Sequence, residues 1–380
     1  MMKKLLFAAL PFLIFSCSEK SSKVTSSLSE NAEKKFTLEV LDTLFIDSGE
    51  NIILIENQVP RTDFSDDLNY YFNYNRKQNL IDVINLNTLK LDKQIPFDTE
   101  GPNGTTSNVS SIDHFGHGNF MINNFGDGIQ IFDRNGQKLE NFKLNNDDLK
   151  GDRLSINERI NTFGTIDPIT YKYYSIYGHG YGEPHGIAVI NIESKSLTKK
   201  PIKGLDAIKA YKVELLSDGG RMSRNSSIYF QMVNDKILIS NGSVNELFVY
   251  DMKNDTTIHH SFESKLTANR QPKPSKNLVH SKEEFNKTYL ETENVVSFKN
   301  FIADPGHERY YRISIGKGSL NMQEWTYVLT AFDKNFNQIS ENEIPNEHYS
   351  TNNFIKDNKI FFQHNIEDEL AFVVMAIKEI

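Results

Sequence analysis

The chain repeats one pattern of β-forming residues along most of its length. Each unit holds a strand, a short turn rich in glycine and asparagine, a second strand that ends near aspartate or asparagine, and a third, more polar strand; one more strand precedes most units. The six units begin at Tyr70, Gly118, Tyr171, Lys236, Glu308 and Lys359. Successive units of four antiparallel strands, which must stack to bury their apolar faces, are the pattern of a β-propeller.

The two ends of the repeat complement each other. The unit that starts at Lys359 lacks an outer strand, whereas a surplus strand over residues 35–46 precedes residues 51–57, which we expect to open the first unit. An N-terminal strand paired with the last unit would close a ring and remove an exposed sheet edge. We therefore predict an all-β fold over residues 36–380, a six-bladed β-propeller closed by an N-terminal strand. No segment with helical periodicity is long enough to favour an α/β fold.

The N-terminus has the features of an export signal. Lys3 and Lys4 precede an apolar run over residues 5–15 and the small residue Ser16, so we predict a signal peptide over residues 1–16. The next residue, Cys17, completes a sequence that resembles the lipobox of bacterial lipoproteins, in which this cysteine is acylated. The alternative is an ordinary signal peptide followed by a chance cysteine.

Cys17 is the only cysteine in the chain, so an internal disulfide is excluded. Residues 17–35 are rich in serine and charge and nearly free of large apolar side chains, which is typical of a flexible tether. Ser18 after the cysteine resembles outer-membrane sorting, and Glu19 resembles an acidic surface-export signal. We expect an outer-membrane lipoprotein on the periplasmic or cell-surface side, held in the membrane by lipidated Cys17.

Several of these features together resemble a known group of proteins. The loop "DTEGPNG" over residues 98–104, the segment "FDKNFNQISENEIP" over residues 332–345, the leader and the total length are similar to a Bacteroidota lipoprotein family of unknown function. Members of that family are similar to six-bladed β-propellers of the NHL and TolB kind. The resemblance implies a fold and a location, and it implies no catalytic residue.

The charge of the chain excludes one class of partner. The formal net charge is −8, and removal of Lys3 and Lys4 with the leader makes it more negative still. No cluster of lysine and arginine offsets this balance, so we expect no nucleic-acid partner.

The strand order also predicts which loops share a face. In a propeller, the loop between the second and third strands of a unit lies on the same face as the crossover to the next unit. This places "YGHGYGEPHG", residues 177–186, on one face with the crossovers over residues 98–108, 203–225 and 263–294. We expect ligands on this crossover face. Our candidate ligand-binding residues are Glu100, Asn103, His179, Glu183, His185, Arg221, Arg224 and Trp325.

Each candidate also has a simpler interpretation. His179, Glu183 and His185 offer three metal-ligand types, but their spacing matches no zinc signature, and we expect a loop shaped by its glycines. His114 and His117 precede the second strand of their unit, so they belong to the opposite face and cannot complete the set. Trp325 could stack on a sugar or peptide or simply pack. Arg221 and Arg224 could clamp a carboxylate or form ion pairs.

The sequence contains no catalytic constellation that we recognise. A Gly-x-Ser-x-Gly nucleophile motif is missing, and the paired Glu283 and Glu284, like Glu367 and Glu369, are expected in solvated turns. We predict a binding or scaffolding module for a peptide, a glycan or an envelope protein, with no metal and no cofactor. The alternative is a propeller hydrolase or lyase on the crossover face, using His179, Glu183 and His185 with or without a metal.

Overall fold

The structure is a computed structural model, and it describes most of the chain. The described residues are 21–27, 35–55, 61–106, 108–116, 118–124, 128–180, 182–217, 219–293, 295–317, 325–345 and 349–379. The segment expected to be a signal peptide, Cys17 and His117 lie outside them. Strands dominate the described residues, so the all-β class is confirmed.

Six successive antiparallel sheets follow the chain. The first sheet consists of β3 (Thr62–Phe64), β4 (Tyr70–Asn75), β5 (Leu80–Asn85) and β6 (Lys90–Pro96), and the second of β7 (Val109–Phe115), β8 (Asn119–Asn124), β9 (Gly128–Phe132) and β10 (Lys138–Phe142). The third sheet consists of β14 (Lys172–Gly178), β15 (Pro184–Asn191) and β16 (Ser196–Pro201). Two short strands, β12 (Arg159–Ile160) and β13 (Thr165–Asp167), pair with β14, and β11 (Lys150–Gly151) pairs parallel with β16 at the other edge.

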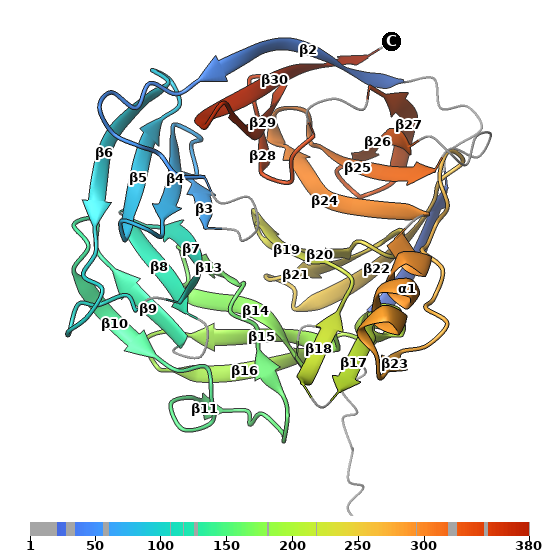
Figure 1. The fold of residues 1–380 in the computed structure, drawn as a ribbon, viewed down its shortest axis with the longest axis horizontal. Helices are drawn as coiled ribbons and strands as arrows, with labels where there is room; N and C mark the ends of the chain where they lie inside the picture. The colour runs from blue at the N-terminus through green and yellow to red at the C-terminus, as the bar shows by residue number, and fades with distance from the viewer. Residues whose placement is uncertain are drawn as a thin grey trace, which may run out of the picture.

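The next three sheets continue this order. The fourth sheet consists of β19 (Ile228–Val233), β20 (Lys236–Asn241), β21 (Glu246–Asp251) and β22 (Thr256–Glu263), with β1 (Ser21–Ser27) at its edge. The fifth consists of β24 (Val296–Asp304), β25 (Arg309–Lys317), β26 (Trp325–Asp333) and β27 (Gln338–Ile344). The sixth consists of β28 (Asn353–Lys356), β29 (Lys359–Ile366), β30 (Glu369–Glu379) and β2 (Phe36–Phe45). Figure 1 shows these sheets arranged around a ring, with the first strand of each sheet nearest the centre.

The core lies between the sheets. The second and third strands of most sheets are buried along their length, as in β8, where the five residues from Phe120 to Asn124 are all buried. Six apolar clusters each join two sheets that follow one another along the chain, and one of them joins the sixth sheet to the first through Phe372 and Tyr71. Each sheet therefore buries both faces against its neighbours.

The expected closing strand is present. β2 pairs antiparallel with β30 from Phe36 opposite Glu379 to Phe45 opposite Ala371, with a register shift between Val40 and Asp42. Phe36 and Leu38 are buried in the cluster between the fifth and sixth sheets. The N-terminal strand thus covers an edge of β30 that would otherwise expose unpaired backbone groups.

Three expectations about local structure were wrong. Seven residues of the expected tether form β1, which pairs parallel with the edge of β22, because polar serine and threonine side chains fit a solvated edge strand. Residues 51–55 form no strand; Ile53 packs into the core there, and β3 opens the first sheet instead. Glu283 and Glu284 lie in the first turn of a helix, where acidic side chains are favoured, and not in a turn.

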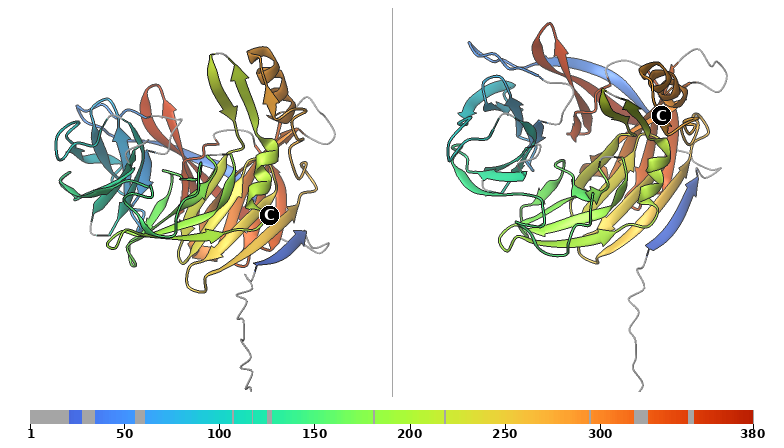
Figure 2. Two further views of the ribbon diagram at one scale, coloured as in Figure 1. Left: turned by 90° about the horizontal axis from the view of Figure 1, so that it is seen from below. Right: turned by 60° about the horizontal axis from the view of Figure 1, so that its bottom comes forward.

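The two longest crossovers fold together into a small cap. Residues 203–225 contain the 3₁₀ helix η1 (Leu205–Tyr211) and the hairpin of β17 (Val213–Ser217) and β18 (Gly220–Arg224), and residues 263–294 contain β23 (Leu278–Val279) and helix α1 (Lys282–Glu293). β17 pairs parallel with β23, and Leu215 packs with Phe285 of α1. Figure 2 shows the hairpin and α1 standing together away from the ring.

Helical structure is otherwise sparse. One further 3₁₀ turn, η2 (Pro305–His307), joins β24 to β25. In the described part of the chain, no helix is both long enough and apolar enough to cross a lipid bilayer.

Candidate functional site

The glycines of "YGHGYGEPHG" have structural causes. The loop turns from β14 into β15, and Gly180 has a φ of +69°, in the left-handed region that favours glycine. A Cβ on Gly178 would lie 2.1 Å from the Glu183 carbonyl oxygen, and one on Gly182 would lie 2.2 Å from the Asn225 side-chain oxygen. Only one of these three glycines needs positive φ, so close packing against β15 and the cap shapes the loop as much as backbone freedom does.

His185 forms a partly buried polar cluster with two partners, Glu158 and Lys199. Its Nδ1 lies 3.1 Å from Oε1 of Glu158, whose carboxylate is almost completely buried. The other carboxylate oxygen accepts hydrogen bonds from Lys199 Nζ at 2.7 Å and from the Ser155 backbone N–H at 2.8 Å. Glu158 and Lys199 therefore fix the orientation of the His185 ring.

His179 and Glu183 begin a second chain of charges that reaches the cap. His179 Nδ1 lies 3.9 Å from a Glu183 oxygen, and Lys212 Nζ lies 3.3 Å from the other. Lys212 also pairs with Glu214 at 3.0 Å, and Glu214 accepts from Arg221 Nη2 at 2.6 Å. The rings of His179 and His185 are 4.5 Å apart between centroids, so the two chains meet. The structure thus brings four of the predicted residues together.

The other candidates lie elsewhere on the crossover loops. Glu100 and Asn103 belong to the loop between β6 and β7, where the Asn103 amide donates to Gln137 at 3.1 Å. Arg224 stacks on the Tyr289 ring of α1 at 4.6 Å, so it holds the cap together. Trp325 begins β26 with 43% of its side chain exposed, and Lys317 lies 6.0 Å from its ring. Arg221 and Arg224 thus have partners within the cap.

A cavity that the sequence analysis missed lies beside this cluster. It has a volume of about 450 Å³ and is lined by the crossover from β10 to β12, by β12 and β14, and by the start of the "YGHGYGEPHG" loop. Its lining includes Asn157, Glu158, Arg159, Thr162 and Gly180. Polar residues in a long crossover give no sequence signal of their own, because similar runs occur in solvated loops.

Thr162 has an unusual environment in this cavity. The residue is 9% exposed, and its hydroxyl has no hydrogen-bond partner among the described residues. An unsatisfied buried hydroxyl costs about 1–3 kcal/mol, and this oxygen is buried, so a molecule in the cavity does not reach it. Arg159 is exposed at the same cavity and makes no ion pair with a described residue.

The cluster can hold protons, but it has few other chemical options. A histidine that is oriented by a carboxylate can act as the general base that activates a nucleophile. No hydrogen bond in the described residues joins His179 or His185 to a serine or threonine hydroxyl, and Glu183 is neutralised by Lys212. In the same part of the chain, no three side chains of histidine, cysteine, aspartate or glutamate are placed to hold a metal ion.

Glu158 provides a test of the cluster. Burial opposes its ionisation, but hydrogen bonds from Lys199, Ser155 and His185 lower its pKa to about 2. A depressed carboxyl pKa adds stability that is present above the unfolded-state pKa and lost as the pH falls towards 2. Glu158→Gln should therefore lower the free energy of unfolding by about 3 kcal/mol at pH 7, with a smaller difference below pH ~4.

Urea unfolding of both proteins across this pH range measures the difference. Glu193→Gln, an exposed change on the same sheet, should change stability by less than about 0.5 kcal/mol. An equal loss at pH 7 and at pH ~3 would show that the charge of Glu158 contributes nothing.

Comparison with known proteins adds a family and a fold. A family model described as "Domain of unknown function (DUF4221)" matches residues 34–343. A crystal structure of a member of this family from Bacteroides vulgatus ATCC 8482 is 13% identical, with a TM-score of 0.67, and the match covers 91% of this chain and 99% of that one. No curated protein matches the chain.

Two more distant solved structures are also similar. The β-propeller domain of Cps50 (Swd1) from Myceliophteria thermophila is 8% identical, with a TM-score of 0.39 and coverage of 87% of this chain and 99% of that one. The calcium-binding protein regucalcin from Agrobacterium tumefaciens is 12% identical, with a TM-score of 0.40 and coverage of 92% and 96%.

Proposed function

Since this chain belongs to the DUF4221 family, whose function is unknown, we propose a function from its site: an envelope-anchored lipoprotein whose ring of sheets is a binding module. In this proposal the six sheets are the blades of a six-bladed β-propeller, and Cys17 carries the lipid. The ligand is a peptide, a glycan or a segment of an envelope protein. It binds on the crossover face, in the cavity beside Glu158.

The cavity with the exposed guanidinium of Arg159 at its rim, which makes no ion pair with a described residue, is the observation that carries the proposal. An acidic group of a ligand in the cavity would pair with this guanidinium. The cavity of about 450 Å³ is within the range of small-ligand pockets, and its lining combines apolar side chains such as Leu144 and Ile176 with polar groups. Amide and hydroxyl side chains suit the hydroxyls of a sugar or the backbone of a peptide.

The structural surroundings support binding more than catalysis. The cavity is bounded by strand β14 and by a crossover that side-chain hydrogen bonds hold in place, such as the one from the Leu154 backbone N–H to Asn146 at 2.8 Å, which favours a preformed site. Its charged neighbours Glu158 and Lys199 are already paired with each other, and no activated nucleophile accompanies them in the described residues. The exposed cation Arg159 at the rim would favour ligands that carry an acidic group.

Binding to arrays of glycans and peptides tests this proposal. The unacylated mature chain should bind at least one class of array member, and Arg159→Glu should weaken that signal. Lys77→Glu, an exposed change on the first sheet, makes the same charge change and should leave the signal intact. Equal signals for wild type and Arg159→Glu, or no signal at all, would contradict this site. Incorporation of labelled palmitate at Cys17, absent in Cys17→Ser, tests the anchor separately.

Most substitutions of buried residues lower the free energy of unfolding, but we expect Thr162→Val not to lower it. Because valine replaces an unpaired hydroxyl with a methyl group of similar size, the free energy of unfolding should stay equal or rise by about 1 kcal/mol. Thr105→Val is the matched control, since Thr105 is fully buried and its hydroxyl donates to Asn79 at 2.9 Å. That change should lower stability by about 1–3 kcal/mol in the same denaturation experiment. A comparable loss for Thr162→Val would mean that its hydroxyl is satisfied within the protein.

A further inference from the structure

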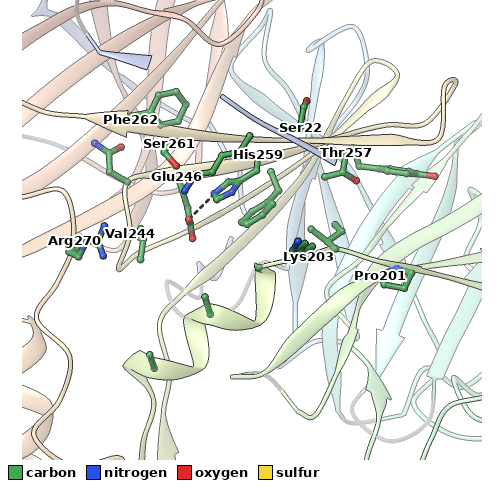
Figure 3. Close-up of a pocket in the computed structure, with 18 of the residues that line it drawn as sticks. Ser22, Pro201, Lys203, Val244, Glu246, Thr257, His259, Ser261, Phe262 and Arg270 are labelled. Atoms are coloured by element: carbon green, nitrogen blue, oxygen red, sulfur yellow. Dashed lines mark hydrogen bonds and ion pairs between the residues drawn. The ribbon is translucent and has the colours of Figure 1, made fainter. Parts of the chain in front are cut away.

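A second, larger cavity lies on the outer side of the ring. It is a groove of about 840 Å³ between the third and fourth sheets, bounded by β16, η1, β21 and β22. Figure 3 shows Lys203 and Pro201 on one side and Val244, Glu246, His259 and Arg270 on the other, with Ser22 and Thr257 nearby. The groove is separate from the cavity beside Thr162, since only the Lys199 side chain of the Glu158 cluster reaches it.

The groove is basic in a chain that is acidic overall. Its two carboxylates are already paired: Glu246 with His259 at 2.9 Å, and Asp255 with Lys200 and with the Tyr250 hydroxyl. Four exposed cations on its lining make no ion pair with a described residue. They are Lys23, Lys203, Arg270 and Lys273. Lys200 neutralises Asp255, and the unpaired cations outnumber the one remaining carboxylate, Glu246, so they leave a net positive field inside the groove.

The N-terminal strand ties this groove to the expected anchor. Ser22 and Lys23 of β1 belong to its lining, and Ser21 pairs with Thr257 of β22. Ser21 follows Cys17 by four residues, and an extended chain of that length spans at most about 14 Å. The backbone pairing of β1 over seven residues therefore holds the groove close to the position of Cys17.

We propose that this groove binds the phosphate-bearing headgroup of an anionic phospholipid in the membrane that holds Cys17. The proposal rests on the lipid anchor of the proposed function. Exposed lysine and arginine near an anionic membrane surface each contribute about 1 kcal/mol of attraction. The lipid on Cys17 would supply one attachment and the groove a second, so that the ring is oriented with its fourth sheet towards the membrane.

Vesicle sedimentation of the unacylated mature chain, Cys17→Ser, tests the groove without the anchor. We expect salt-sensitive binding to vesicles of mixed phosphatidylcholine and phosphatidylglycerol and little binding to phosphatidylcholine alone. The double variant Lys203→Glu with Lys273→Glu should lower the partition coefficient at least about tenfold. The control double variant Lys77→Glu with Lys93→Glu alters two exposed lysines of the first sheet by the same charge and should bind like the parent.

Three outcomes would overturn the proposal. They are equal binding to both kinds of vesicle, equal losses in the groove and control variants, and tight binding of inorganic phosphate in calorimetry without any preference for anionic vesicles. The last result would assign a soluble anion to the groove. Palmitate labelling of wild type is read out separately, so a missing acyl chain and a groove that ignores anionic lipid are distinguished.

Discussion

Replacing Phe36 with alanine is expected to lower the free energy of unfolding by about 3–5 kcal/mol, the usual cost of removing a buried aromatic side chain. Phe36 is 2% exposed and begins the closing strand β2. Its ring packs edge to face against Tyr311 at 5.9 Å, and the Arg309 guanidinium lies 5.0 Å from it. These contacts join the closing strand β2 to the fifth sheet, so their loss weakens the closure of the ring.

Leu41→Ala is the matched control for this prediction. Leu41 lies in the same strand, but 47% of it is exposed, so its truncation should cost less than about 1 kcal/mol. Thermal or urea denaturation of the two variants gives the comparison. If both variants lost the same small amount, β2 would be a dispensable edge strand, and the closure drawn from the pairing of β2 with β30 would be wrong.

Asp63→Asn is expected to stabilise the protein at pH 8. Asp63 in β3 keeps some solvent exposure, but burial by the surrounding protein raises its pKa to about 7, against hydrogen bonds from the His114 and Phe64 backbone amides. Asp113 in β7 accepts from the Ile166 N–H at 3.2 Å, and burial together with the charge of Asp63 also raises the pKa of Asp113. Two carboxylates therefore lie close together on the inner strands, where ionisation of both is costly.

The sign of the pH dependence follows from the raised pKa. Stability from Asp63 is present below the unfolded-state pKa of about 4 and is lost as the pH rises through about 7. Asparagine keeps an acceptor for the His114 N–H, which lies 2.5 Å from the carboxylate, without the charge. The variant should gain about 4 kcal/mol over wild type at pH 8 and little at pH ~4.

Denaturation of Asp63→Asn and wild type at the two pH values measures this gain. Asp92→Asn, an exposed change in β6, should be neutral at both. A variant that is less stable than wild type at pH 8 would show that the Asp63 carboxylate is satisfied when charged, and the account of the inner strands would fail.

The sequence predicted the parts of this fold that depend on local pattern. Strands such as β7 and β8 follow from runs of β-forming residues that lie between turn residues. The surplus strand before residue 46 could complete only the last sheet, which lacked an outer strand. The pairing of β1 was not predictable, since Ser21–Ser27 is polar and its partner β22 is more than 200 residues away. The pairing satisfies backbone groups at the free edge of β22, and such backbone hydrogen bonds require no particular side chains in β1.

The site was predictable only in part, for similar reasons. The shared face of His179, Glu183, His185 and Arg221 followed from strand order, because loops on one face of a ring stay near one another. Glu158 and Thr162 were missed, since a buried ion pair and an unpaired hydroxyl depend on three-dimensional packing of a long crossover. The cap was missed as well, because β17 and β23 pair across about 60 residues.

Replacing Arg159 with alanine should weaken the binding of an array ligand about tenfold or more, because one charge-assisted hydrogen bond is lost. The stability of the variant should stay within about 0.5 kcal/mol of wild type, since Arg159 is exposed. Titration calorimetry with the same ligand gives both affinities. Equal affinities in the two proteins would contradict the proposal that the cavity beside Glu158 is the binding site.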